Sequence, residues 1–133
     1  MKTIEKREDV KKLVYTFYDK ILKDKMLSPI FNMHLQGDDW PPHLEKMTDF
    51  WETNLFGIPK FRGNPVSAHA RVDRSIDYGI TEDHFAHWVE MWHETVDELF
   101  EGELAERAKL ASNRMASGLF MAVWNQRPND MRE

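Results

Sequence analysis

Apolar residues recur along the first part of the chain at intervals of three and four positions, with polar breaks between the runs. The first run covers roughly residues 8–23 and predicts one amphipathic helix. Its apolar face consists of Val10, Leu13, Val14, Phe17, Ile21 and Leu22. Ser28 and Pro29 then begin a short second helix, because serine is a favoured N-cap and proline fits the first turn.

The same helical period returns in three longer runs. One helix is predicted to begin at Pro41–Pro42 and to end at Gly57. The next is capped by Thr81, carries the most regular apolar stripe of the chain and ends at Gly102. The last one ends at Arg127. No stretch alternates apolar and polar residues over the length of a strand, so the sequence predicts an all-α fold with four substantial and two short helices.

The segment between residues 57 and 80 shows little helical pattern. Gly57–Ser67 is predicted to be a loop, in which Pro65 starts a short helical turn that carries His69. Arg71–Gly79 is predicted to be polar and irregular. Loops of this length are uncommon inside compact domains and are usually functional, so we expect the segment to contribute to a functional site.

Length, net charge and amino-acid composition exclude several classes of function. The chain has 133 residues, enough for one domain over residues 1–133, with residues 1–6 and 128–133 expected to be flexible. Its net charge of −5 argues against nucleic-acid binding. It has no cysteine, no apolar run of membrane-spanning length and no secretory leader, so we expect a cytoplasmic protein without a membrane partner.

The histidines are the candidates for metal binding or catalysis. His84, His87, Glu90 and His93 lie on the predicted helix after Thr81. Glu90-x-x-His93 is the motif of di-iron bundles, but such a site needs two of these motifs and the chain has one. Because His84, His87 and Glu90 lie opposite the apolar stripe, a solvated polar face is the simpler interpretation. A non-haem metal site stays an alternative.

Four motifs, taken in order from about Val10 to Ala122, resemble the group III (P-type) truncated haemoglobins. They are Phe17-Tyr18-Asp19-Lys20 with Leu27-Ser28-Pro29-Ile30-Phe31; His43 followed by Met47, Phe50 and Trp51; Phe61-x-Gly63-x-Pro65-x-x-x-His69; and Phe85-x-x-Trp88-Val89-x-x-Trp92. The third motif is the most specific. Taken alone, each candidate site residue in these four motifs has an ordinary interpretation, such as an exposed histidine or an aromatic residue of the core.

The resemblance implies a globin-like, truncated two-on-two helical sandwich around haem b. It makes His69 the proximal iron ligand and places Tyr18, His43 and Trp88 on the distal side. The haem would be lined by Phe17, Phe31, Met47, Phe50 and Trp51. Arg62 and Arg71 flank the ligand segment and are candidates for binding the haem carboxylates.

The expected function is haem-based binding of O₂, NO, CO or peroxide. A polar distal pocket favours chemistry on bound oxygen species over oxygen transport, such as NO dioxygenation or a pseudo-peroxidase reaction, with a reductase as partner. A non-catalytic haem-based gas sensor or binding module stays an alternative, because fold and cofactor do not determine the reaction.

Overall fold

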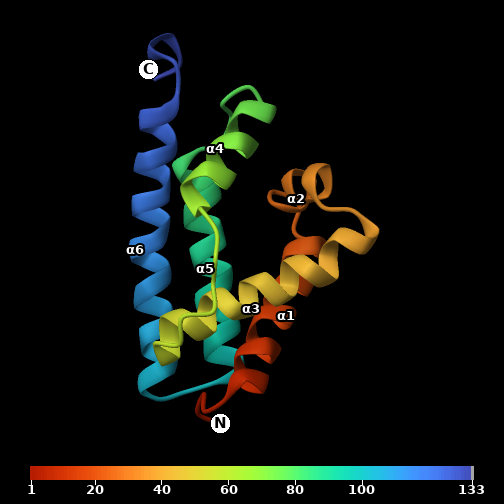
Figure 1. Cartoon of the computed structure of the whole chain (residues 1–133), viewed down its shortest axis with the longest axis vertical. Coiled ribbons are helices and arrows are strands. Elements are labelled where there is room, and N and C mark those ends of the chain that lie inside the picture. Colours follow the sequence, from red (N-terminus) through yellow and green to blue (C-terminus); the bar gives the residue numbers. More distant parts are fainter. Residues whose placement is uncertain (133) are drawn as a thin grey trace.

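Six α-helices and two short 3₁₀ turns make up the regular structure of residues 1–132, the part of the chain that this computed structural model describes (Figure 1). The helices are α1 (Arg7–Lys23), α2 (Ser28–His34), α3 (Trp40–Phe56), α4 (Pro65–Ser75), α5 (Glu82–Leu99) and α6 (Glu103–Gln126). The turns are η1 (Gly37–Asp39) and η2 (Asn129–Met131). The predicted all-α class is confirmed.

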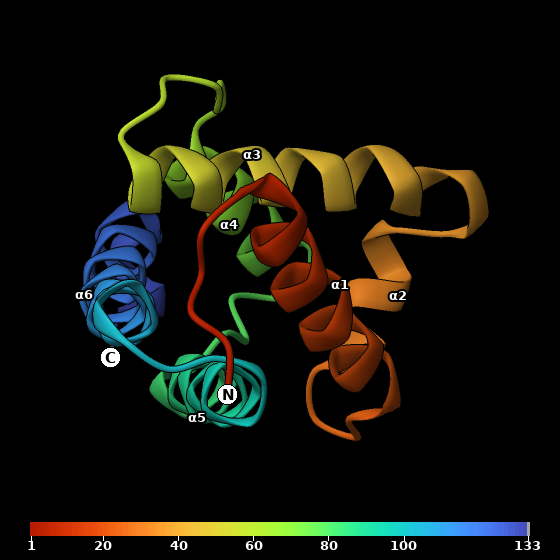
Figure 2. The same cartoon turned by 90° about the horizontal axis from the view of Figure 1, so that it is seen from below.

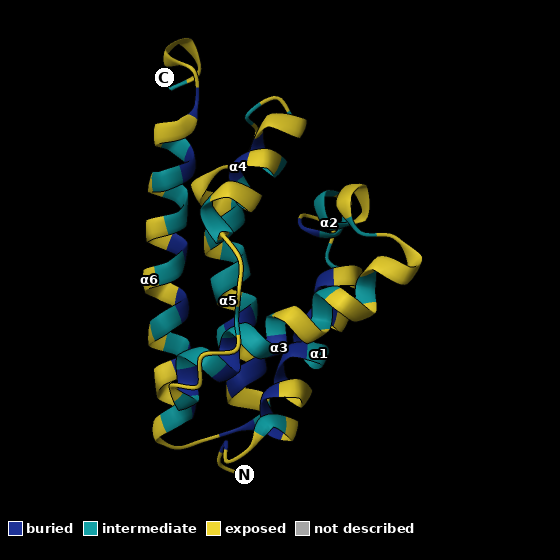
Figure 3. Ribbon diagram, viewed as in Figure 1, coloured by how far each residue is buried: buried dark blue, intermediate teal, exposed yellow. Residues whose placement is uncertain are grey.

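The helices cross in two layers. α5 and α6 run side by side, and α3 crosses them while packing on α1 (Figures 1 and 2). α1 also packs against α5, and α4 packs against α6. Buried residues gather where α1, α3 and α5 meet (Figure 3). This arrangement leaves α2 at the edge, where no residue of the helix is buried.

Trp92 is the centre of the core. It is fully buried, and its indole N–H donates to the carbonyl of Ala108 at 3.2 Å. The Trp51 ring stacks on it with centroids 4.4 Å apart, and the Phe17 ring meets it edge-on at 5.0 Å. One aromatic cluster therefore ties α1, α3, α5 and α6 together, as the apolar stripe of the Thr81–Gly102 run predicts.

Several helix ends follow the predicted signals, but the prediction that Ser28 caps the second helix was wrong, because α2 begins at Ser28, with Leu27 at the N-cap position and no side-chain cap. Gly57 adopts the left-handed conformation (φ 71°) after α3, which favours glycine because it has no Cβ. Asn64 caps α4 by accepting a hydrogen bond from the Ser67 N–H, and Pro65 occupies the first turn. Thr81 caps α5 in the same way through the His84 N–H.

One element is longer than the sequence predicts. The expected short turn at Pro65 is an eleven-residue helix that continues to Ser75, so the prediction that Arg71–Gly79 is irregular was wrong for its first half. The reason is tertiary, because Ala70 and Asp73 are buried where α4 packs against α6. After the helix the chain is irregular, with positive φ at Asp77 (56°) and Tyr78 (61°).

Contacts in the structure hold the N-terminal end of the chain. Ile4 is buried, and the carbonyl of Lys2 accepts a hydrogen bond from the Glu101 N–H at 3.0 Å. The flexibility expected for residues 1–6 and 128–133 stays a prediction, and residue 133 lies outside the described residues. None of the helices within residues 1–132 has the length and apolar character that a membrane crossing requires.

Candidate functional site

A cavity of about 350 Å³ is lined by side chains of all six helices. Its walls are mainly apolar, with a few polar groups among them, which is the usual composition of a site for a small organic ligand. Eight residues singled out in the sequence line it: Tyr18, Phe31, His43, Met47, Phe50, Trp51, His69 and Trp88. The structure therefore brings together residues from four separate motifs.

His69 projects from α4 with one ring nitrogen already engaged. Its Nδ1 lies 2.6 Å from the carbonyl oxygen of Pro65, and because a carbonyl only accepts, Nδ1 carries the proton. Burial lowers the pKa of His69, an effect that the bond to Pro65 opposes only in part. The ring is therefore neutral near pH 7, with a free lone pair on Nε2. A neutral imidazole held through its other nitrogen is the form that ligates metals.

Tyr18 supplies a hydroxyl to the same cavity. The residue is buried, and burial raises its pKa well above the usual value, so the hydroxyl stays protonated. Its ring meets Phe17 edge-on at 5.1 Å and His43 at 5.2 Å. Within residues 1–132 the hydroxyl has no hydrogen-bond partner, so its proton is available to a ligand.

His43 lies in the first turns of α3, and its Nε2 is a buried polar atom without a hydrogen-bond partner in the described chain. Leaving such an atom unpaired costs about 1–3 kcal/mol, so its presence in a cavity wall points to a ligand or water that pairs with it. Burial lowers the pKa of His43, and the nearby Lys46 ammonium lowers it further.

Trp88 adds a further polar group, its indole N–H, to the residues of the cavity wall. Its ring lies parallel to Trp92, with centroids 6.1 Å apart, and meets Phe17 edge-on at 5.4 Å. These two neighbours hold the indole in one orientation on the cavity wall. Its N–H has no partner in the described part of the chain, so it is a second donor next to the Tyr18 hydroxyl.

The two half-buried histidines of the cavity wall, His43 and His69, make the stability of the ligand-free protein depend on pH. The pKa values of His43 and His69 are lowered from 6.5 in the folded state, so the unfolded chain binds more protons as the pH falls. We expect the free energy of unfolding to decrease from about pH 7 to pH 5. Denaturant unfolding at several pH values measures it.

The matched variant is His43→Gln/His69→Gln, which removes both titrating groups. Its free energy of unfolding is expected to change less between pH 7 and pH 5 than that of the unaltered protein. An equally steep decrease in both proteins would assign the pH dependence to other groups.

Three predicted contacts lie away from the cavity wall. Phe17 is fully buried in the core, in contact with Tyr18 and Trp88 and not among the lining residues. Arg62 and Arg71 are exposed and are not among the lining residues either. Their contact with a bound cofactor stays a prediction.

Three titratable residues of the cavity wall were not predicted from the sequence, namely Lys46, His84 and His34, whose Nε2 lies 2.9 Å from the Ser75 hydroxyl oxygen. Lys46 follows His43 by one helical turn, and its ammonium lies 5.9 Å from the Phe61 ring with no carboxylate partner among residues 1–132. His84 was assigned to a solvated face, but it is half-buried and lines the cavity. The signal was present in its spacing, since His84 precedes Trp88 by one turn and such residues share a helix face.

The other histidines of α5 are engaged in contacts between helices. His87 Nε2 lies 2.7 Å from an oxygen of Asp24, and His93 Nε2 lies 3.1 Å from the Lys109 carbonyl. Glu90 is exposed. Over the described part of the chain, no group of three histidine, cysteine or acidic residues is placed to hold a metal ion. The non-haem alternative therefore finds no cluster to support it.

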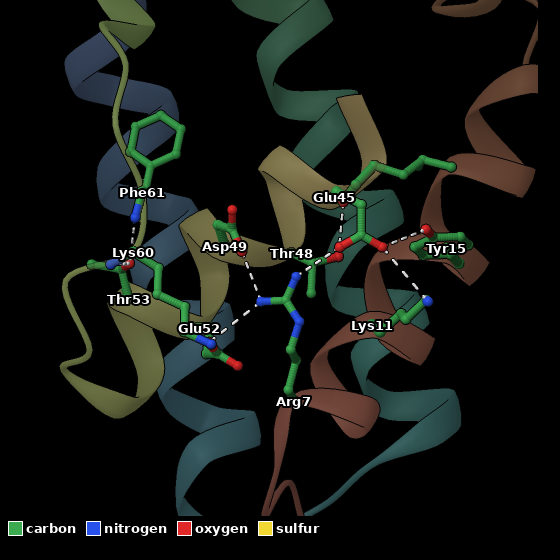
Figure 4. Close-up of polar contacts among 11 residues, drawn as sticks. Arg7, Lys11, Tyr15, Glu45, Thr48, Asp49, Glu52, Thr53, Lys60 and Phe61 are labelled. Atoms are coloured by element: carbon green, nitrogen blue, oxygen red, sulfur yellow. Dashed lines mark hydrogen bonds and ion pairs between the residues drawn. The ribbon is translucent and has the colours of Figure 1, made fainter. Parts of the chain in front are cut away.

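A charged network holds the loop before α4 against α3 (Figure 4). Glu52 is only 2% exposed, and its carboxylate lies 2.6 Å from the Lys60 ammonium and 3.4 Å from the Arg7 guanidinium. The Thr53 hydroxyl accepts hydrogen bonds from the Lys60 and Phe61 N–H groups. These bonds fix the loop so that the Phe61 ring lines the cavity.

Comparison with known proteins agrees with this architecture. No family model matches the chain. A curated protein, the group 3 truncated haemoglobin ctb of Campylobacter jejuni, is 26% identical over 120 residues, which are 86% of this chain and 91% of that protein. The crystal structure of a group III truncated haemoglobin from Campylobacter jejuni matches with a TM-score of 0.82 and 24% identity, over 97% of this chain and all of the other. The chain has the truncated-haemoglobin fold. The predicted resemblance to group III truncated haemoglobins is thereby confirmed.

Within the truncated-haemoglobin fold the cavity lies among α1, α3, α4 and α5, with α2 and α6 completing its walls. This arrangement explains why the resemblance extends through nearly the whole chain, since each of the four motifs supplies one side of the same cavity.

Proposed function

We propose that this protein binds haem in the cavity, with His69 Nε2 as the axial ligand of the iron. The observation that carries the proposal is the His69 ring, which is neutral, held at Nδ1 by the Pro65 carbonyl and free at Nε2 inside an apolar cavity. The unpaired Nε2 of His43 fits a site that is completed by a bound group. Because the given sequence has no cysteine, it offers no thiol for thioether attachment, and we propose haem b as the cofactor.

Haem bound here supplies an iron that takes O₂, NO, CO or peroxide as a sixth ligand. Tyr18, His43 and Trp88 come from three helices other than α4, which carries His69. The Tyr18 hydroxyl and the Trp88 indole N–H donate hydrogen bonds to a ligand atom that carries negative charge. The apolar walls exclude water, which strengthens both bonds.

Donors of this kind favour chemistry over transport. A charge-assisted hydrogen bond contributes about 1.5–3 kcal/mol, so two of them retain O₂ strongly and make its release slow. A reaction that consumes the bound ligand, such as NO dioxygenation or peroxide reduction, suits such a pocket better than oxygen delivery. This chemistry requires a reductase as partner, and the cysteine-free chain is compatible with the reducing cytoplasm, where we place the protein.

The haem carboxylates need cationic partners. Lys46 is the cation on the cavity wall, and it has no carboxylate partner within the described residues. We therefore assign one carboxylate to Lys46. Arg62, in the loop before α4, and Arg71, on α4 itself, are exposed and remain candidates for the other carboxylate.

Titration with haemin, followed by reduction and addition of CO, tests the proposal. We expect a sharp Soret band that saturates at one haem per chain and shifts when CO binds, because the iron then has a fixed histidine on one side and an open position on the other. A spectrum that stays that of free haem would overturn the proposal.

A further inference from the structure

A buried ion pair joins the helix that carries His69 to the C-terminal end of α6. Asp73 lies one turn after His69 on α4 and is 1% exposed, and Arg127 directly follows α6 and is 6% exposed. The guanidinium Nε donates to one carboxylate oxygen at 2.8 Å, and Nη2 donates to the other at 2.9 Å. This two-bond arrangement fixes both distance and direction.

The same pair closes the connection between α4 and α5. The Ile80 N–H donates to Asp73 Oδ1 at 3.0 Å, and Arg127 Nη2 donates to the Ile80 carbonyl at 2.6 Å. The Tyr78 N–H donates to the main-chain carbonyl of Asp73 at 2.7 Å. These bonds hold Asp77 and Tyr78 at positive φ, a conformation that is uncommon for residues other than glycine.

The ion pair is a directional contact between α4 and the residue that follows α6. α4 has eleven residues, and the residue that it buries next to Asp73 is the small Ala70. Contact through small apolar groups is not directional, so it tolerates sliding and rotation of one helix on another. The ion pair is directional. Buried ion pairs are weak contributors to stability, but they select one arrangement among several of similar energy.

His69 moves with Asp73, because one turn of a continuous helix separates them. Ile80, which the pair also holds, lines the cavity together with His69. We propose that the Asp73–Arg127 ion pair fixes the position of α4 and thereby places His69 Nε2 in the cavity where it would bind the iron. The part that concerns the iron rests on the proposed function, whereas the attachment of α4 does not.

Two variants test the proposal. Asp73→Asn keeps the shape and one acceptor but loses the charge, and Arg127→Lys keeps the charge but loses the two-bond geometry. Both are expected to retain haem while shifting or broadening the iron–histidine stretching band in the resonance Raman spectrum of the reduced protein. In the haem-free protein, both are expected to raise amide hydrogen exchange in residues 70–75 by about tenfold.

The matched control is Val10→Ala, which lowers stability from the buried face of α1 without touching α4 or the cavity. It is expected to leave the iron–histidine band unchanged. An unchanged band and unchanged α4 exchange in both ion-pair variants would overturn the proposal, as would an equal band shift in Val10→Ala. If the unaltered protein forms no haem complex, the proposed function is wrong. Amide exchange in α4 of the haem-free variants then tests by itself whether the ion pair holds α4.

Discussion

Replacement of His69 by alanine is expected to remove the proposed iron ligand and to weaken haem binding by at least about 100-fold, since loss of even an outer partner of a metal ligand costs 10–100-fold. Within residues 1–132, His69 is the cavity residue whose ring is neutral, held at Nδ1 by a carbonyl and free at Nε2. Haem titration of the variant, monitored at the Soret band, measures the change.

Imidazole provides a direct check on this interpretation. Added to the His69→Ala variant, it is expected to enter the space left by the side chain and to restore the band of a histidine-ligated haem. His93→Ala is the matched control, because His93 is bonded to the Lys109 carbonyl away from the cavity. If His69→Ala bound haem as the unaltered protein does, the iron ligand would have to be sought elsewhere.

Removal of the two distal donors is expected to speed the release of O₂. Tyr18→Phe removes an O–H group, and Trp88→Phe removes an N–H group. Neither group has a hydrogen-bond partner among the described residues, and both residues line the cavity. Each lost charge-assisted hydrogen bond of about 1.5–3 kcal/mol corresponds to roughly a 10- to 100-fold faster dissociation. Displacement of O₂ by CO in a stopped-flow experiment gives the rate.

The carbon monoxide complex distinguishes hydrogen bonding from a change of cavity shape. Bound CO carries less negative charge than bound O₂, so its dissociation is expected to change little in the same variants. Met47→Leu alters the cavity wall without removing a donor and serves as the control. An unchanged O₂ dissociation rate in Tyr18→Phe would refute the donor role of that hydroxyl.

The helices and their ends could be read from the chain because local rules govern them. Apolar residues at helical spacing marked α1, α3, α5 and α6, and capping residues such as Thr81 marked where a helix begins. The four motifs then predicted which residues share a site, and eight of those residues line the cavity, whereas Phe17, Arg62 and Arg71 do not. Phe17 lies in the core behind the cavity wall, because adjacent residues on a helix, such as Phe17 and Tyr18, point in different directions.

Other features depended on contacts between distant parts of the chain. α4 extends to Ser75 because Asp73 pairs with Arg127, and neither residue is apolar or periodic. His84 faces the cavity because α5 turns that side toward α4, which a single-helix pattern does not specify. Burial of a polar group is favourable only when its partner is in place. Positions such as Asp73 and Arg127 can therefore be recognised only from the packed arrangement of the helices.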